Sequence, residues 1–337
     1  MTRGLTNVLG IAALLLACMT TAGLAADNHI TYQGKDGPGK GKHIAFVSGC
    51  WEYRPEESFP MLAKILAERH GFTTTVIFPI DREDGTINPN ASDNMPGMEA
   101  LADADMMITL MMDLELPDDQ MKHIVDFVES GKPILGIRSS TLAFSFRKNK
   151  QSKYIRYRMN STEWPGGFGQ QILGSPWCGH HGHHARESTR GLIHGPRRSH
   201  PILRGVKDIW GPTDVYVINK LPEDATVLAH GMVLTGMKPD DPPNLDKPIM
   251  PMIWTREFKG PTGKDTRVVT TTIGAGPDMA CEDLRRALVN GCYWALHLED
   301  KIPAEANVDY VDGFEPSFFG RNKFKKGLKP DDLRIKQ

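Results

Sequence analysis

The chain lacks an excess of basic charge, a long apolar run and a low-complexity linker. Its 40 lysines and arginines face 41 aspartates and glutamates, which gives a formal net charge of −1 at pH 7. Because nucleic-acid binding calls for a basic face, this balance argues against nucleic acid as a partner. The apolar run Val8–Met19 is too short to cross a bilayer, so we expect no membrane span. With 337 residues and no dividing linker, one large domain is expected.

Residues 1–26 have the composition of an export signal. Arg3 supplies a short positive region, Val8–Met19 supplies the apolar run, and Gly23–Ala26 offers the small residues that signal peptidases cut. We therefore expect cleavage at the end of this segment and a mature protein in the periplasm or outside the cell. Leu15–Cys18 also resembles a lipobox, in which the cysteine would be acylated, but its second leucine fits that motif poorly.

Cysteine is scarce, and four of the five cysteines would remain after cleavage. An exported protein can pair its cysteines. Cys281 and Cys292 bracket one predicted helix and would lie about 16 Å apart at about 1.5 Å per residue, which is too far for a disulfide. Cys50 and Cys178 lie in predicted loops that can meet, so this pairing stays open. We expect free thiols at all four positions.

The first part of the chain alternates between apolar strand patterns and helical patterns. The helical repeat is clearest after Pro117, where apolar residues recur at i, i+3, i+4 and i+7 before Gly131 ends the helix. Strands that alternate with helices favour a parallel sheet covered on both faces, which is a flavodoxin-like α/β fold. The predicted strands are 43–47, 73–78, 105–111 and 133–137, and the predicted helices are 56–70 and 117–131.

This alternation is lost in residues 147–212, which we expect to form a loop-rich insertion over the active edge of the sheet. Residues 27–41 form an N-terminal extension, 42–300 the α/β domain, and 301–337 an extended tail on the surface. The remaining predicted elements are strands at 226–229, 253–257 and 267–272, the last two joined as a hairpin across 260–263, and an amphipathic helix at 284–298.

Five segments in this order carry a resemblance to a known family. They are His43–Gly49 with Glu52–Arg54; Gly131–Arg138; His200–Gly205; Pro251–Arg256; and Arg267–Gly274 leading to Asn290–Ala295. Together they resemble the trehalose-utilisation (ThuA-like) family over roughly residues 42–300. The resemblance implies the fold of class I glutamine amidotransferases. It also implies a link to sugar metabolism, through trehalose and oxidised (keto) disaccharides.

The chain lacks the nucleophile that an amidotransferase carries after the Gly136-Ile137 turn. Arg138 occupies that position, and a guanidinium cannot attack a carbonyl. The expected His-Pro-Glu after the last strand is replaced by Thr272-Ile273-Gly274. Glutaminase activity is therefore excluded. ThuA-like relatives often carry histidine at the elbow, so Arg138 departs from that pattern too. The several N–H donors of the Arg138 guanidinium would suit an anionic or polyol ligand.

The segment Cys178–His184 packs four of the twelve histidines into five positions. One use is a divalent metal such as zinc or manganese, held by His180, His181, His183, His184 and a carboxylate, Glu187 or Glu52. No His-Glu-x-x-His motif is present, so the spacing does not identify a metal. A second use is acid–base catalysis, for which His180 and His184 are the candidates. The third alternative is that some of these rings only bond loop carbonyls or face solvent.

The loop after the first strand lies at the carboxyl edge of the sheet, where open α/β sheets bind ligands. Glu52 is the candidate base, with Tyr53 and Arg54 as substrate contacts. A Glu52–Arg54 salt bridge that merely shapes the loop is the alternative. Arg138, Trp164 and Trp177 complete the predicted substrate contacts. Aromatics in long loops also form satellite cores, and we expect that for at least two of Trp51, Trp164, Phe168 and Trp177.

We therefore expect an exported carbohydrate-active enzyme, a hydrolase, lyase or isomerase that acts on a modified (keto) sugar or glycoside by histidine and carboxylate chemistry. The alternative is a non-catalytic carbohydrate-binding or scaffold protein that kept the fold after losing the nucleophile. Both require residues 52–54, 138 and 180–184 to line one cavity.

Overall fold

The computed structural model describes Met1 and residues 28–336. Apart from Met1, the predicted export signal, including Cys18, lies outside the described residues. Within the described part no helix has the length and apolarity needed to cross a membrane. Cys50, Cys178, Cys281 and Cys292 are all free, as expected.

A ten-stranded sheet runs through the described chain in the order β1-β3-β2-β4-β5-β10-β9-β8-β6-β7. The central strands β3, β2, β4, β5 and β10 pair in parallel, and the flanking pairs are antiparallel. The predicted α/β class is therefore correct for the core of the sheet. The strands are β1 (His29–Tyr32), β2 (His43–Gly49), β3 (Thr73–Ile77), β4 (Met106–Met111), β5 (Ile134–Ile137), β6 (Thr189–Ile193), β7 (Ile209–Gly211), β8 (Ala225–Val233), β9 (Met250–Lys259) and β10 (Asp265–Thr271).

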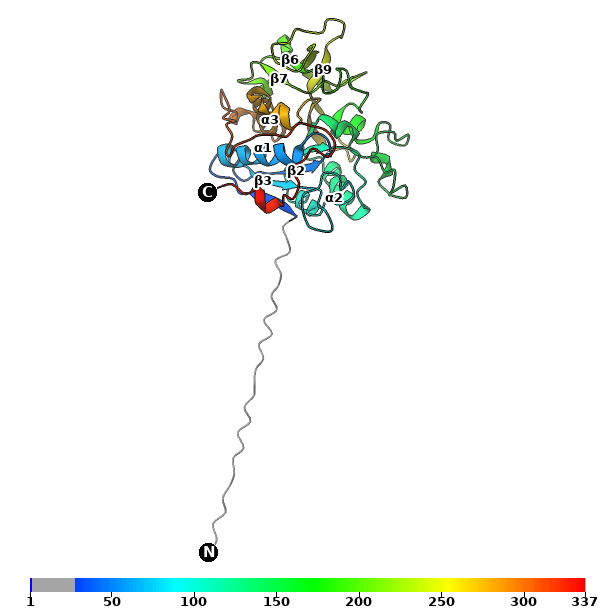
Figure 1. Cartoon of the computed structure of the whole chain (residues 1–337), viewed down its shortest axis with the longest axis vertical. Helices are drawn as coiled ribbons and strands as arrows, with labels where there is room; N and C mark the ends of the chain where they lie inside the picture. The colour runs from blue at the N-terminus through cyan, green and yellow to red at the C-terminus, as the bar shows by residue number, and fades with distance from the viewer. Residues whose placement is uncertain (2–27, 337) are drawn as a thin grey trace.

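Within residues 28–336, three α-helices cover the two faces of the sheet: α1 (Pro55–His70), α2 (Asp118–Glu129) and α3 (Glu282–Ala295). The chain steps from β2 to β3 in one direction and from β4 to β5 in the other, so crossovers of one hand put α1 and α2 on opposite faces. Alternation along β2 matches this, since Ile44 and Phe46 pack in the cluster that includes α1 and α3, while Ala45 and Val47 pack in the cluster that includes α2. Residues of α1 and α3 share one hydrophobic cluster, and Figure 1 shows both helices.

Short helical turns connect these elements. In the part of the chain that the structure describes, eight are 3-10 turns and one, at Gly169–Leu173, is a π turn. The 3-10 turns are Met98–Leu101, Arg138–Leu142, Ile155–Tyr157, Gly195–Arg197, Pro201–Leu203, Gly276–Ala280, Glu299–Lys301 and Pro330–Leu333.

Residues 147–212 are not only loops. Their second half contains β6 and β7, which extend the sheet beyond β8 by antiparallel pairing and form the far end of the molecule in Figure 1. The predicted hairpin is present, with β9 paired antiparallel to β10. The strands that the sequence reading missed are short, three to five residues, and β6 has a glycine at its centre.

The C-terminal tail is irregular and most of its residues are exposed or partly exposed, but a few of its apolar side chains are buried in the core. Ile302, Ala306, Val308 and Phe319 are each at most 4 % exposed and join the cluster on the α1 and α3 side. The tail is also tied to the sheet end, because the Tyr32 hydroxyl donates to the Leu333 carbonyl at 2.8 Å. It is therefore part of the fold.

Candidate functional site

The site forms at the carboxyl edge of the parallel strands. The loop after β2 brings Glu52 and Tyr53, and the turn after β5 brings Arg138. The histidine segment reaches this edge because residues 179–181 run antiparallel beside 215–217, with His181 N–H donating to the Val215 carbonyl at 3.0 Å. The three segments therefore meet at this edge, but Arg54 and Arg138 are fully buried, so the prediction that all three segments line one cavity does not hold.

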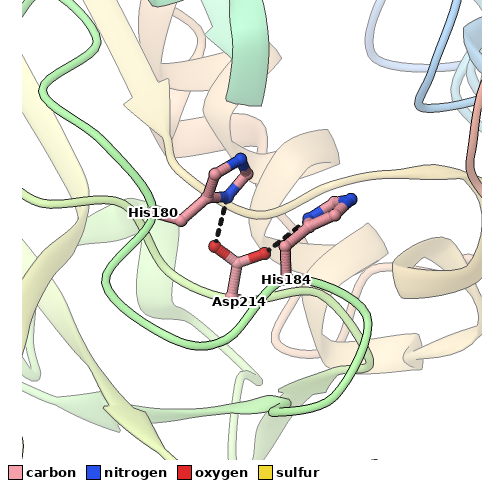
Figure 2. A group of neighbouring side chains, drawn as sticks. All are labelled: His180, His184 and Asp214. Carbon is pink, nitrogen blue, oxygen red and sulfur yellow. Dashed lines mark hydrogen bonds and ion pairs between the residues drawn. The ribbon is translucent and has the colours of Figure 1, made fainter.

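Asp214 joins these segments and was missed by the sequence analysis. Its Oδ2 accepts a hydrogen bond from His180 Nδ1 at 2.7 Å, and its Oδ1 accepts one from His184 Nδ1 at 3.0 Å. Figure 2 shows both rings directed at the one carboxylate. Gly182 permits this approach, because a Cβ there would lie 2.8 Å from the Asp214 Cβ. A single aspartate in an irregular segment gave no sequence signal.

The Asp214 carboxylate is fully buried and stays ionised. Burial alone would raise its pKa, but the Arg138 guanidinium and the hydrogen bonds from His180 and His184 outweigh burial and hold the pKa well below its usual range. An ionised carboxylate only accepts hydrogen bonds. The Nδ1 atoms of His180 and His184 must therefore carry their hydrogens.

Arg138 does not contact a ligand site, contrary to the sequence prediction. Its side chain is fully buried between the rings of Tyr53 and Tyr216, at 4.2 and 4.6 Å from their centroids. Its Nη1 donates to the carbonyls of Asp214 and Thr272 at 2.8 and 2.9 Å, and its Nη2 donates to Asp214 Oδ1 at 3.1 Å. Arg138 thus positions and neutralises Asp214.

The backbone at Arg138 keeps the sharp elbow of a nucleophile position, with φ +47°. The nearby Cys50 does not replace the missing nucleophile. It is fully buried, and burial raises the pKa of its thiol to about 11, so the reactive thiolate is absent at neutral pH.

His184 bridges two carboxylates. Its Nδ1 bonds Asp214, and its Nε2 lies 3.0 Å from Glu52 Oε1. Burial alone would lower the pKa of His184, but the hydrogen bonds to Asp214 and Glu52 outweigh burial and raise the pKa to about 9. His184 is therefore an imidazolium at neutral pH, and Glu52 is oriented by it.

Arg54 is also buried, so the prediction of a substrate contact at this residue does not hold. Its donors reach the carbonyls of Trp51, Glu52 and Gly320, and its ion pair is with Glu56 at 3.4 Å. The alternative Glu52–Arg54 salt bridge is not formed. Arg54 instead shapes the loop through main-chain oxygens.

The predicted metal set does not assemble as proposed. His181 Nε2 pairs with the Pro248 carbonyl at 2.7 Å, and Glu187 is engaged by Lys247 at 2.6 Å and by the His183 N–H at 2.6 Å. His183 has an exposed side chain. In the described part of the chain the group with metal-ligand spacing is His180, His184 and Asp214, whose donor atoms all lie within 4.8 Å of one another.

Aromatic rings border the two imidazoles. Trp177 lies 5.6 Å from His180, edge to face, and Phe319 of the tail lies 5.1 Å from His184. Tyr53 lies 6.1 Å from His184, although it is buried. Trp164 instead packs on Tyr157 at 4.8 Å in the α2-side cluster and is not part of the site.

Two of the four loop aromatics therefore belong to a core, as the sequence analysis expected. Trp164 and Phe168 both pack in the α2-side cluster. Trp177 borders the site, and Trp51 lies in the loop that carries Glu52, with the Arg321 guanidinium 5.3 Å from its ring centroid.

Comparison with known proteins gives one decisive match. A family model described as trehalose utilisation matches residues 47–295. No curated protein matches the chain. Among solved structures, a putative ThuA-like protein from Bacteroides uniformis is 14 % identical (78 % of this chain, 95 % of that chain, TM-score 0.47). A second, from Parabacteroides merdae, is 12 % identical (84 % and 96 %, TM-score 0.47). These structural likenesses are too distant to support further argument. The family model covers well over half of the chain, and the chain therefore belongs to the trehalose-utilisation (ThuA-like) family.

Proposed function

We propose that this protein is a carbohydrate-active enzyme, a hydrolase, lyase or isomerase that moves a proton on a modified (keto) sugar or glycoside and has no glutaminase activity. The observation that carries the proposal is the Asp214 carboxylate, which holds His180 and His184 at once, with Glu52 next in the chain of hydrogen bonds. Membership of the trehalose-utilisation family supports a sugar substrate. Trp177, which borders His180 and is only partly buried, suits the C–H face of a sugar ring.

His180 is the proposed base. The bond from its Nδ1 to ionised Asp214 fixes the tautomer of the neutral ring, in which Nε2 carries the lone pair that takes a proton. The side chain is 33 % exposed, which leaves the ring accessible to a ligand. Asp214 and Arg138 act through His180 and are positioning residues.

Glu52 is the proposed partner of His180 in proton transfer, and His184 is its positioning residue. One Glu52 oxygen is held by His184, and the side chain is 15 % exposed. A carboxylate and an imidazole that are both partly exposed at one edge of the sheet can act as acid and base on neighbouring atoms of a sugar.

Metal binding is the competing use of the same atoms. A divalent ion, zinc or manganese, would be held by His180, His184 and Asp214, since nitrogen and carboxylate donors suit both metals. We favour proton chemistry because both Nδ1 atoms already donate to Asp214. Elemental analysis of the purified protein tests this choice, and a stoichiometric metal that is lost in His180→Asn would replace the acid–base scheme with a metal-assisted one.

The decisive experiment incubates the protein with intact and keto forms of trehalose and related disaccharides and follows the sugars by NMR. Turnover that disappears in His180→Asn but persists in His183→Asn supports the proposal, because His183 is an exposed histidine of the same segment. Binding without turnover by the unmodified protein would favour the non-catalytic alternative. That alternative is a real one because Arg138 occupies the position of the nucleophile.

We also propose that the chain is exported, with residues 1–26 as the signal and a lipid anchor at Cys18 as the lesser alternative. Cell fractionation followed by N-terminal mass analysis tests this. A full-length chain retained in the cytoplasm would contradict it.

A further inference from the structure

The C-terminal tail contributes to the site although it lies beyond the region that the family model matches, which ends at residue 295. Phe319 is buried against His184 at 5.1 Å and against Tyr53 at 6.0 Å. Its neighbour Phe318 stacks on it, with the ring centroids 4.2 Å apart and the planes at 25°. Phe318 is 43 % exposed. An open aromatic ring therefore lies one ring away from His184.

The tail is pinned to the loop that carries Glu52. The Gly320 N–H donates to the Glu52 carbonyl at 2.9 Å, and the Gly320 carbonyl accepts from Arg54 Nη2 at 3.1 Å. Gly320 has φ +129°, a backbone conformation that residues other than glycine rarely adopt. The preceding Ser317 N–H donates to Glu57 Oε2 at 2.8 Å. Contacts on both sides of Phe318 thus hold it in place, so its exposure is not that of a loose chain end.

Phe318 also has a polar companion. The Lys323 ammonium lies over the Phe318 ring, 5.2 Å from its centroid, while Phe319 stacks on the same ring. The lysine is exposed, so a sugar that stacks on Phe318 would take the place of the ammonium on that ring. An aromatic face beside a hydrogen-bond donor matches a sugar ring, which has an apolar C–H face and hydroxyls at its rim.

We propose that tail residues 317–321 form a wall of the site and that Phe318 is a sugar-binding platform that determines which substrate is held against His180 and Glu52. This inference rests on the proposed function and extends it. It assigns binding, not proton transfer, to the tail. Phe319 supports the platform and backs His184, so it is a positioning residue.

The test measures KM and kcat for the sugar that the unmodified protein turns over, together with sugar binding by titration calorimetry. Phe318→Ala should weaken binding and raise KM about three- to tenfold, as loss of one ring contact does, with kcat nearly unchanged. Phe318→Trp should restore binding. Phe324→Ala is the matched control, because Phe324 belongs to the same tail but lines a separate hollow with Asp84 and Asn88.

The outcomes separate this inference from the proposed function. Unchanged binding and KM in Phe318→Ala, while His180→Asn still loses turnover, would overturn the platform and leave the enzyme in place. An equal loss in Phe324→Ala would overturn it too, because the effect would then be a general disturbance of the tail. If the unmodified protein neither binds nor converts any of the sugars, both proposals fail.

Discussion

The Oδ2 atom of Asp214 lies 2.7 Å from Nδ1 of His180, and this contact determines what the histidine can do. Since Asp214 stays ionised, His180 must donate through Nδ1, and in the neutral form of the ring Nε2 is then the acceptor. The same carboxylate binds His184, so the two rings are fixed relative to each other. The rest of the site can be tested through this pair.

Replacing His180 by asparagine should lower kcat about 10²- to 10⁴-fold, the usual contribution of one general base. The side chain is at the rim and one third exposed, so the free energy of unfolding should change little. Steady-state kinetics and urea unfolding on the same preparation check both statements. A variant that retains full kcat would show that His180 carries no proton in the rate-limiting step.

Replacing Arg138 by methionine should destabilise the fold by about 3–5 kcal/mol, because it removes the buried guanidinium that pairs with Asp214 and leaves only the two histidines to offset the buried charge. Adding Asp214→Leu should recover a large part of that loss, since a buried ion pair exchanged for apolar groups is often neutral. Urea unfolding of the single and double variants measures the coupling. Equal stability of both variants would mean that Arg138 acts through its carbonyl contacts alone.

The fold was predictable where the apolar repeat of an element separates its buried face from its exposed face. The helix predicted between Pro117 and Gly131 is α2 (Asp118–Glu129), and its apolar repeat, Met121, Ile124 and Val125 among others, is buried. The edge strand β1 and the short β6 and β7 were missed. Their pairing is determined by neighbours far away in sequence, and their few residues show no clear alternation.

The site was predictable in residue type and less so in role. His180, His184 and Glu52 were found because imidazoles and a carboxylate occur in segments that reach one edge of the sheet. The role of Arg138 depends on the direction of its side chain, which the tyrosine rings and Asp214 determine after folding. Asp214 itself comes into place through the antiparallel contact between 179–181 and 215–217, which no local pattern encodes.

A second stability effect comes from Glu56, which is 4 % exposed and has both carboxylate oxygens buried without a hydrogen-bond partner. Burial raises its pKa to about 7 from an ordinary value of 4.5. The folded state therefore binds the proton more tightly than the unfolded state. Its contribution is fully present below pH 4.5 and is lost as pH rises through about 7. Glu56→Gln should flatten the fall in unfolding free energy between pH 4.5 and 7, and an unaltered slope would show that the carboxyl is solvated.

His184 also makes the free energy of unfolding fall as pH rises, but over a higher pH range than Glu56. Its pKa is about 9 in the folded protein against 6.5 for an ordinary histidine, because the bonds to Asp214 and Glu52 outweigh burial. The stability that the charged ring contributes is therefore fully present below pH 6.5 and is lost as pH rises through 9. Urea unfolding at intervals from pH 6 to 10 should show this fall in the unmodified protein and a shallower one in His184→Gln.

His183→Gln is the matched control for that series, because His183 is an exposed ring in the same segment. It should follow the unmodified protein at every pH. If the His184 variant keeps the full slope between pH 6.5 and 9, the imidazolium between the two carboxylates does not exist at neutral pH. His184 would then be a neutral ring that donates to Asp214 through Nδ1 and accepts at Nε2. The bond to Glu52 would in that case require a protonated Glu52 as the donor. A proton would then move from Glu52 to His184, and not from His184 to Glu52.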